Sequence, residues 1–225
     1  MGHPRLGPVL TLVLTRHGHT DRSEPDQYLG QTIDISLSVR GRTDAERLRD
    51  RLAGIAFDRV ISSPLRRAAE TAAIIVPGRT IETDVRLTEA DYGDWEGQVT
   101  EVLDEGWPDL RRAWMEDPAR LGPPNGENGD AIAERASAFL RDLAATELPL
   151  TSGGSERRIL AIGHSTLNRV LLTAALGVPT RDYRRRFRQD WLNLTVLRLE
   201  ADGRGMLLLA NDTAHVRAPG ATPWP

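Results

Sequence analysis

The stretch LTLVLTRHGHTDRSE (residues 10–24) decides the fold, because an apolar run changes abruptly into an arginine and two closely spaced histidines. Val9–Thr15 is a continuous run of leucine and β-branched residues, the pattern of a strand buried on both faces of a parallel sheet. Arg16, His17 and His19 follow directly. Three kinds of site fit such a cluster: metal ligands, a covalent nucleophile, or an ordinary polar loop.

The overall composition limits the class of protein. The chain has 225 residues, of which 40% are hydrophobic and 27% charged, and such a chain buries roughly 70 to 75% of its unfolded surface as a globular domain. Its formal net charge of −3 gives no electrostatic reason to expect a nucleic acid or an anionic membrane as partner. The absence of cysteine from the sequence excludes disulfides, thiolate catalysis and cysteine-ligated metal centres.

The apolar segment near the N-terminus is short. Val9–Leu14 is much too short to span a bilayer, and the residues around it lack the pattern of a signal peptide. The sequence therefore predicts a soluble cytoplasmic protein that has neither a nucleic acid nor a membrane as partner. Both a monomer and a homodimer remain open.

Strand-like and helix-like patterns alternate along the chain. Continuous apolar runs predict strands, and apolar residues spaced by three and four predict helices. The expected strands are 9–15, 57–62 and 158–162; the expected helices are 38–53, one that Ser63 begins as N-cap, and 166–176; a hairpin is expected at 191–199 and 206–210. This alternation predicts an α/β fold, a three-layer sandwich with a mostly parallel sheet flanked by helices.

Residues 93–129 interrupt the alternation. Three of the five tryptophans, Trp95, Trp107 and Trp114, lie there among prolines, glycines and short helical pieces. We expect residues 1–225 to form a single domain in which residues 93–129 are a helical insertion, or cap, over the active site.

Polar residues follow each of the three expected parallel strands. In chain order these groups are Arg16-His17, Arg66-Arg67 and Gly163-His164-Ser165. Because the carboxyl ends of parallel strands share one edge of the sheet, where ligands bind in such folds, we expect the groups to meet. A helix dipole opposes arginines in the first turn unless an anion binds there, so Arg66 and Arg67 predict a phosphate or carboxylate site.

These motifs resemble those of the histidine phosphatase superfamily, which has the phosphoglycerate mutase-like fold. The matching stretches are Arg16-His17-Gly18, Ser62 to Ala68 with Thr71-Ala72, Leu87-Thr88-Glu89 with Tyr92 to Gly97, and Gly163-His164-Ser165. Weaker matches at 34–41 and 126–128 extend the resemblance over nearly the whole chain. The stretch from Tyr92 to Gly97 looks like the phosphatase branch, which implies a phosphoric monoester hydrolase acting on a small phosphorylated metabolite.

The resemblance also implies roles for individual residues. His17 corresponds to the nucleophile that forms a phosphohistidine, and Glu89 to the acid that protonates the leaving oxygen. The residues that correspond to the phosphate-binding groups are Arg16, Arg67 and His164, with Gln31, by position only, and Ser165 as further candidates. An imidazole nucleophile divides one displacement into two, and cationic donors neutralise charge on the equatorial oxygens, so no metal or other cofactor is expected.

Some residues depart from the family pattern. His19 stands where the family often has glutamate, and we expect it to be an exposed loop residue. Glu96, beside Gly97, is expected to cap the insertion or to lie at the surface. The five arginines between positions 181 and 188 predict a basic helix whose charges face solvent rather than the rim of the site.

Three alternative functions compete with the phosphatase. A cofactor-dependent phosphoglycerate mutase would share the motifs, and a non-catalytic phosphate-binding domain would keep the same arginines. The sequence HGHTD (residues 17–21) also fits part of the ligand pattern of metal-dependent hydrolases, but such sites need more ligands, and only His3, His164 and His215 remain. An arginine beside a dication is also repelled.

Overall fold

One mixed sheet organises the protein, whose computed structural model describes residues 9–151 and 155–217. In these residues the sheet has six strands in the order β3-β2-β4-β1-β5-β6. The parallel strands are β1 (Val9–Arg16), β2 (Arg59–Ser62), β3 (Glu82–Thr83) and β4 (Glu156–Gly163). The antiparallel strands are β5 (Leu194–Leu199) and β6 (Gly205–Asp212).

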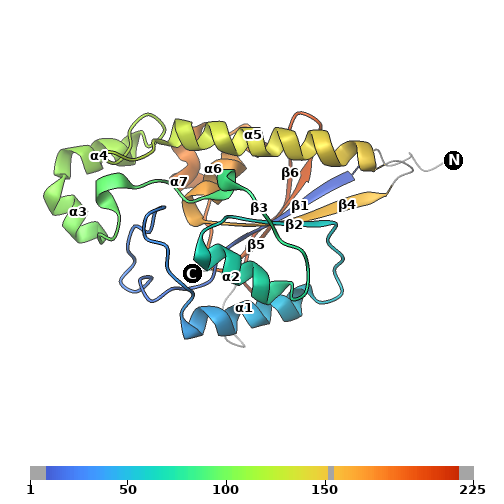
Figure 1. Ribbon diagram of the computed structural model, residues 1–225. Helices are drawn as coiled ribbons and strands as arrows, with labels where there is room; N and C mark the ends of the chain where they lie inside the picture. The colour runs from blue at the N-terminus through green and yellow to red at the C-terminus, as the bar shows by residue number, and fades with distance from the viewer. Residues whose placement is uncertain (1–8, 152–154, 218–225) are drawn as a thin grey trace.

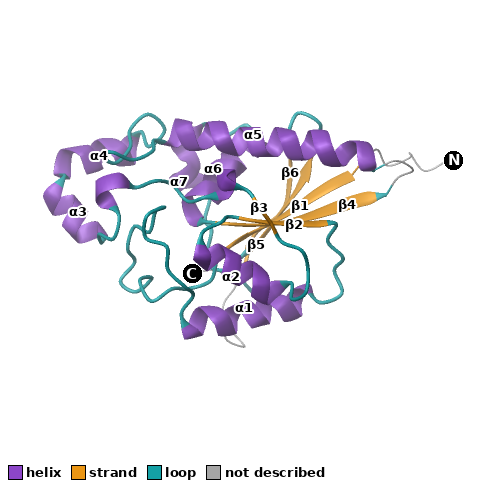
Figure 2. Cartoon of the chain, in the orientation of Figure 1, coloured by secondary structure: helices purple, strands orange, loops and turns teal. Residues whose placement is uncertain are grey.

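Helices cover both faces of the sheet (Figures 1 and 2). One face carries α1 (Val39–Leu52) and α2 (Arg66–Ile75). The other face carries α5 (Gly129–Glu147) and α6 (Ser165–Leu176). The prediction of an α/β three-layer sandwich with a mostly parallel sheet is confirmed.

Several short helices lie outside these two main helical layers. Residues 93–129 contain α3 (Thr100–Gly106) and α4 (Pro108–Glu116), which lie beyond the end of the sheet where β1 and β4 finish (Figure 1). A further short helix, α7 (Tyr183–Arg186), follows α6. The 3-10 turns are η1 (Val85–Leu87), η2 (Gly93–Trp95), η3 (Leu148–Leu150) and η5 (Thr180–Asp182). Among the described residues, no helix is both long and apolar enough to cross a membrane.

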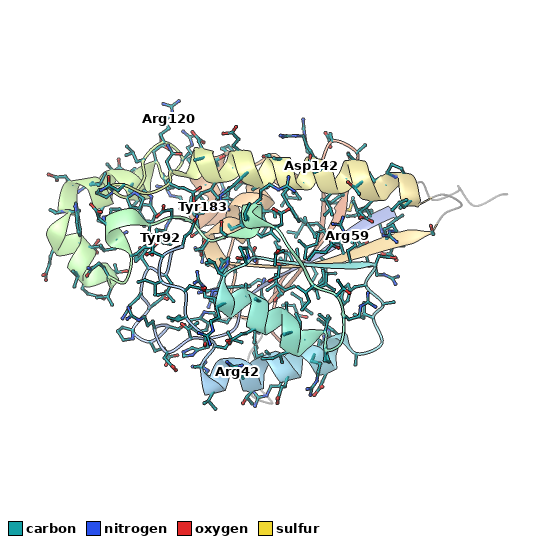
Figure 3. The ribbon with its side chains drawn as sticks, viewed as in Figure 1. Arg42, Arg59, Tyr92, Arg120, Asp142 and Tyr183 are labelled. Atoms are coloured by element: carbon teal, nitrogen blue, oxygen red, sulfur yellow. The ribbon has the colours of Figure 1, made fainter. Side chains whose placement is uncertain are left out.

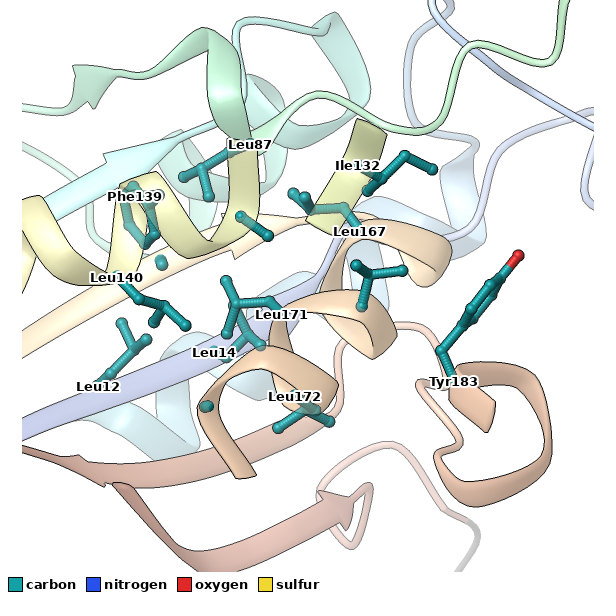
Figure 4. Close-up of a cluster of buried hydrophobic side chains, with 14 of the residues drawn as sticks. Leu12, Leu14, Leu87, Ile132, Phe139, Leu140, Leu167, Leu171, Leu172 and Tyr183 are labelled. Carbon is teal, nitrogen blue, oxygen red and sulfur yellow. The ribbon is translucent and has the colours of Figure 1, made fainter. Parts of the chain in front are cut away.

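The central strands are apolar on both faces because each face has its own core. Leu12 and Leu14 of β1 pack with side chains of α5 and α6, such as Phe139 and Leu171 (Figure 4). Val13 points the opposite way and packs with the buried residues of α1 and α2. Successive side chains of a strand alternate between faces. A strand between two helical layers therefore needs a continuous apolar run, such as the one that forms β1.

The predicted starts of the first two helices compare differently with the structure. Ser38 is the N-cap of α1, and its hydroxyl accepts a hydrogen bond from the backbone N–H of Gly41 at 3.0 Å. The prediction that Ser63 caps the next helix was wrong, because α2 begins at Arg66 with Leu65 as its N-cap. The Ser63 hydroxyl instead accepts from the Leu65 N–H at 3.2 Å and bonds to His164, a partner distant in the chain.

The β1 core contact gives a test of the layered packing. Leu12 is fully buried, whereas Leu208 on β6 is 46% exposed. Leu12→Ala should lower the free energy of unfolding by about 2 to 5 kcal/mol, because it leaves a cavity between tightly packed layers. Leu208→Ala should change it by about 0.5 kcal/mol or less. Urea unfolding measures both, and equal losses would contradict this assignment of the core.

Candidate active site

The pairing of β1 with β4 brings two histidines together. Arg16, the last residue of β1, lies opposite Gly163, the last residue of β4. The backbone N–H of His17 then donates to the Gly163 carbonyl at 3.0 Å. As a result the rings of His17 and His164 lie with their centroids 5.0 Å apart.

A polar cavity of about 240 Å³ opens at this edge of the sheet. It lies where the carboxyl ends of the parallel strands meet, the usual ligand position in such folds. The residues that line it include Arg16, His17, Glu89, Ser165, Arg169 and Arg184. Four predicted site residues therefore share one cavity, while Arg67 and His164 are completely buried next to it.

The imidazole of His17 is buried and neutral. Its side chain is almost completely buried, and its Nδ1 lies 2.7 Å from the Gly18 carbonyl. A carbonyl can only accept, so Nδ1 carries the proton and Nε2 keeps its lone pair. Burial lowers the pKa of His17 well below its ordinary value, and the positive charges of Arg67 and Arg16 lower it further.

His164 bonds to a hydroxyl next to the first histidine. Its Nε2 lies 2.8 Å from the Ser63 hydroxyl, which also accepts the Leu65 N–H. A hydroxyl can donate its proton to this nitrogen, and Nδ1 is then the donor of the neutral ring. Burial, followed by the charge of Arg67, lowers the pKa of His164 well below its ordinary value. His164 is therefore neutral beside His17, and its Nδ1 has no hydrogen-bond partner among the described residues.

The side chain of Arg16 lines the cavity and remains positively charged. Its guanidinium donates to the Gln189 carbonyl at 3.1 Å and lies 5.0 Å from the centre of the Trp191 ring. Burial lowers the pKa of Arg16 to about 10. The side chain is therefore still cationic at neutral pH.

Arg67 and Arg66 occupy opposite environments. Arg67 is fully buried, and its terminal nitrogens donate to the carbonyls of Leu29, Gly30 and Ile33 at 2.9 to 3.2 Å. Arg66 is exposed and pairs with Glu70. Arg67, the residue that the resemblance matches to phosphate binding, is thus the buried member of the pair.

Three donors around His17 have no hydrogen-bond partner. In the described part of the chain, the buried Nε atoms of Arg16 and Arg67 and the Nδ1 atom of His164 are all unpaired. A buried polar group without a partner costs free energy, and the great majority of such groups in folded proteins are paired. Two guanidinium donors and an unpaired imidazole nitrogen beside His17 form a site suited to an anion.

Glu89 lies at the start of α6. Its carboxylate accepts from the backbone N–H groups of Thr166 and Leu167 at 3.1 Å each, and from Ala90 at 2.9 Å. Free N–H groups and the helix dipole both attract a carboxylate to a helix N-terminus. These three bonds hold the Glu89 carboxylate at the cavity wall, with Arg16 and Arg67 among its charged neighbours.

The backbone at Glu89 is held by a pair of residues that the sequence did not indicate. Arg135 of α5 donates to the carbonyls of Arg86, Thr88 and Glu89, and it forms a salt bridge of 3.0 Å with Glu127. Arginine has five donors in a rigid fork, so it can join several carbonyls of one segment. The pair therefore fixes the segment that carries Glu89.

Gln31 belongs to the same network rather than to the cavity wall. Its amide donates to the Glu89 carbonyl at 2.9 Å and to Glu127 at 3.3 Å. The prediction that Gln31 contacts the phosphate directly therefore differs from its position in this structure, where its donors hold the Glu89 segment.

Glu96 anchors the loop that surrounds Arg67. Its carboxylate accepts the backbone N–H groups of Gln31, Thr32 and Ile33 at 2.7, 3.0 and 3.2 Å. The same loop supplies the carbonyls that hold Arg67. Glu96 thus caps a loop rather than the insertion. The role resembles the expected one, but the capped loop lies far from Glu96 in the sequence.

His19 is buried, so its expected exposure was wrong. The residue is 8% exposed, its Nδ1 bonds to the Ser38 hydroxyl at 2.8 Å, and its ring packs edge-on with that of Trp191. The Ser38 N–H also donates to the His19 carbonyl at 3.0 Å. The loop after β1 folds against the start of α1, which removes His19 from solvent.

The expectation that all arginines near α7 face solvent was also wrong. Arg184 lines the cavity, and its guanidinium lies 4.4 Å from the centre of the Trp114 ring. Arg181, Arg185, Arg186 and Arg188 are exposed. Sequence spacing alone did not separate Arg184 from them, because its partner Trp114 comes from the insertion.

The two histidines of HGHTD bond to different partners, and the structure offers no metal-binding cluster among the described residues. His17 Nδ1 is bonded to a carbonyl and His19 Nδ1 to a hydroxyl. Among the described residues, no group of three or more histidine, aspartate or glutamate side chains could hold a metal ion. His3 lies outside the described residues.

Comparison with known proteins identifies the class. The sequence pattern of the histidine phosphatase superfamily (branch 1) matches residues 12–213. The glucosyl-3-phosphoglycerate phosphatase of Mycolicibacterium vanbaalenii is 33% identical over 177 residues, which cover 78% of each chain. The phosphoserine phosphatase 1 of Hydrogenobacter thermophilus is 28% identical over 210 residues, covering 92% of this chain and 95% of that protein.

A solved structure agrees with these matches. Mycobacterial glucosyl-3-phosphoglycerate phosphatase in complex with inorganic phosphate has a TM-score of 0.80 and 30% identity, covering 92% of this chain and 99% of that one. The chain therefore belongs to the histidine phosphatase superfamily. The predictions of this family, of its phosphoglycerate mutase-like fold and of a small-molecule phosphatase are confirmed.

The lowered pKa of His17 has a consequence for stability. Below pH 6.5 the unfolded chain protonates this imidazole while the folded chain does not, so the unfolded state binds more protons and stability falls with falling pH. When the pH falls from 7.5 to 5.5, the free energy of unfolding should therefore decrease less for His17→Gln than for the wild type. The difference should be on the order of 1 kcal/mol. Urea unfolding at the two pH values measures this difference, and identical pH dependence in both proteins would contradict it.

Proposed function

We propose that this histidine phosphatase hydrolyses a small phosphate monoester through a phosphohistidine formed at His17. The observation that carries the proposal is a buried, neutral imidazole with a free Nε2, surrounded by unpaired donors of Arg16, Arg67 and His164. An uncharged nucleophile and a fixed positive field are what phosphoryl transfer needs.

In the first step, Nε2 of His17 attacks phosphorus and the bond to the leaving oxygen breaks. The guanidiniums of Arg16 and Arg67 and the Nδ1–H of His164 bind the phosphoryl oxygens and stabilise their charge in the transition state. Ser165, which lines the cavity, assists in holding the phosphate. Gln31 acts through Glu89, since its amide donates to the carbonyl of that residue.

Glu89 moves the proton. Its carboxyl group protonates the leaving oxygen in the first step, and the product alcohol departs. In the second step the resulting carboxylate accepts a proton from water as the water oxygen attacks the phosphohistidine, which releases inorganic phosphate and restores His17. The place of Glu89 in the cavity wall supports this role, and the three backbone bonds fix the position of its carboxylate.

The proposal includes a metal-independent reaction, because arginines supply the positive field that a dication would otherwise provide. It also includes a single domain in which residues 93–129 border the active site, and a location in the cytoplasm, where small phosphorylated metabolites occur. Hydrolysis is favoured over the mutase reaction, since the relatives named above are phosphatases.

The two histidines of the opening stretch give a matched test of the nucleophile. With p-nitrophenyl phosphate and excess EDTA, His17→Asn should lose at least about a hundredfold in turnover. His19→Asn should keep turnover, because His19 bonds to Ser38 outside the cavity. Intact-protein mass spectrometry after an alkaline quench should find one added phosphoryl group on the wild type and His19→Asn only.

Two results would count against this proposal. A phosphoryl adduct on His17→Asn would place the nucleophile elsewhere. Loss of wild-type turnover in EDTA, restored by zinc or manganese, would contradict the metal-independent reaction. Circular dichroism of both variants establishes that the fold is retained.

The role of Glu89 is tested by comparing leaving groups. Glu89→Gln should lose on the order of a hundredfold in kcat with an alkyl phosphate, whose alkoxide must be protonated as it leaves. The loss should be much smaller with p-nitrophenyl phosphate, whose leaving group is already stable as an anion. Equal losses on the two substrates would assign Glu89 a positioning role instead.

A further inference from the structure

Two further arginines, one from α6 and one from α7, also line the cavity. Arg169 comes from α6, one turn after His164, and Arg184 comes from α7. Both side chains are partly buried. Tyr92 and Tyr183 lie in the same region between the insertion and α6 (Figure 3). None of the steps proposed above uses either arginine.

Arg184 is held in place by an aromatic partner. Its guanidinium lies 4.4 Å from the centre of the Trp114 ring, within the range of a cation–π interaction. Trp114 is itself buried against Trp95 with ring centroids 5.3 Å apart. A guanidinium stacked on a rigid aromatic cluster is fixed in orientation, so its donors are prepared to bind a ligand rather than free to move into solvent.

The charges of Arg169 and Arg184 are not neutralised by the protein. In residues 9–151 and 155–217, neither guanidinium has a carboxylate oxygen within 4.0 Å, and the buried Nε of Arg169 has no hydrogen-bond partner. Arg111, which stacks on the same Trp114 ring, does have such a partner, Asp104, at 2.8 Å. Arg111 is thus paired with a carboxylate, whereas Arg184 has the neutral hydroxyl of Tyr183 as side-chain partner.

The two positive charges also act on each other. Burial lowers the pKa of Arg169, and the charge of Arg184 is the next largest cause. Glu89 lines the same cavity, but its oxygens are engaged by backbone N–H groups. An anion between the two guanidiniums would relieve their repulsion and satisfy the unpaired donor.

We propose that Arg169 and Arg184 bind a second anionic group of the substrate. The inference rests on the proposed function, which places the reacting phosphate at His17 in the same cavity. The substrate class is then a compact phosphate monoester that carries a carboxylate or a second phosphate. The cavity of about 240 Å³ falls below the roughly 300 to 1,000 Å³ of typical ligand pockets, in agreement with a small molecule.

Matched substrates test the inference on the wild-type protein. 3-Phosphoglycerate and glycerol 3-phosphate differ only in a carboxylate that replaces a hydroxymethyl group. 1,3-Propanediol bisphosphate and 3-hydroxypropyl phosphate differ only in a second phosphate. In at least one pair, kcat/KM should be about 10- to 100-fold higher for the doubly anionic member, the scale of a charge-assisted hydrogen bond. The pair that shows the preference identifies the second group as a carboxylate or a phosphate.

Variants assign the preference to the two arginines. Arg169→Gln and Arg184→Gln should each reduce the preference at least tenfold, and the ratio within a pair cancels any general loss of catalysis. Arg186→Gln removes the same charge from an exposed position of α7 and should leave the ratio unchanged. If a glutamine variant fails to fold, the corresponding lysine variant keeps the charge without the guanidinium fork and should lose part of the preference.

The failures of the two proposals are distinguishable. Hydrolysis of p-nitrophenyl phosphate and of both pairs without any preference would overturn the second-anion site and leave the proposed function standing. A preference that persists in both glutamine variants, or disappears equally in Arg186→Gln, would also overturn it. No hydrolysis of any of these substrates would overturn the proposed function and the inference together.

Discussion

The parallel pairing of β1 with β4 is the constraint on which the site depends. Residues 9–16 pair one by one with residues 156–163, so both strands end at the same level and each is followed by a histidine. A slip of one residue would move every side chain of β1 to the other face and exchange the two cores. The same slip would separate His17 from the Gly163 carbonyl that positions it. Core packing therefore enforces the register that the chemistry requires.

Electrostatics at this edge combine buried cations with neutral imidazoles. A buried guanidinium is costly unless its donors are satisfied. The terminal nitrogens of Arg67 donate to three carbonyls, which are dipoles without net charge and leave its positive charge in place, while its Nε has no partner among the described residues. That field, with burial, keeps His17 and His164 neutral. One arrangement thus supplies both the positive charge and the uncharged imidazole on which the proposed reaction depends.

Carboxylates behind the cavity hold its loops in place. Glu96 binds three consecutive amides of the loop around Arg67, and Glu127 with Arg135 holds the segment of Glu89. Glu96 accepts from backbone N–H groups of a segment distant in sequence, whereas Arg135, paired with Glu127, donates to the backbone carbonyls of Arg86, Thr88 and Glu89. Loops can carry reactive groups only when a scaffold restricts them, because catalytic geometry tolerates little displacement. Residues 93–129 contribute to that scaffold through Glu96, Glu127 and Trp114.

The local sequence determined the layers and the order of the site motifs. Hydrophobic periodicity is a property of short segments, so the continuous run before Arg16 predicted a strand buried on both faces, and the motifs after the strands predicted the edge at which they meet. The family resemblance added roles for His17 and Glu89 that periodicity could not supply. Boundaries were less predictable, as at Ser63, because a hydroxyl near a helix can bond to a distant residue instead of capping.

Only the tertiary structure decided which polar residues face the cavity. Arg184 and Arg186 lie two residues apart in one basic run, yet one lines the cavity against Trp114 and the other is exposed. His19 is buried because the loop after β1 folds against α1. The physical reason is the same in each case: burial of a charged or polar side chain depends on partners supplied by other elements. The sequence near the residue contains no record of those partners.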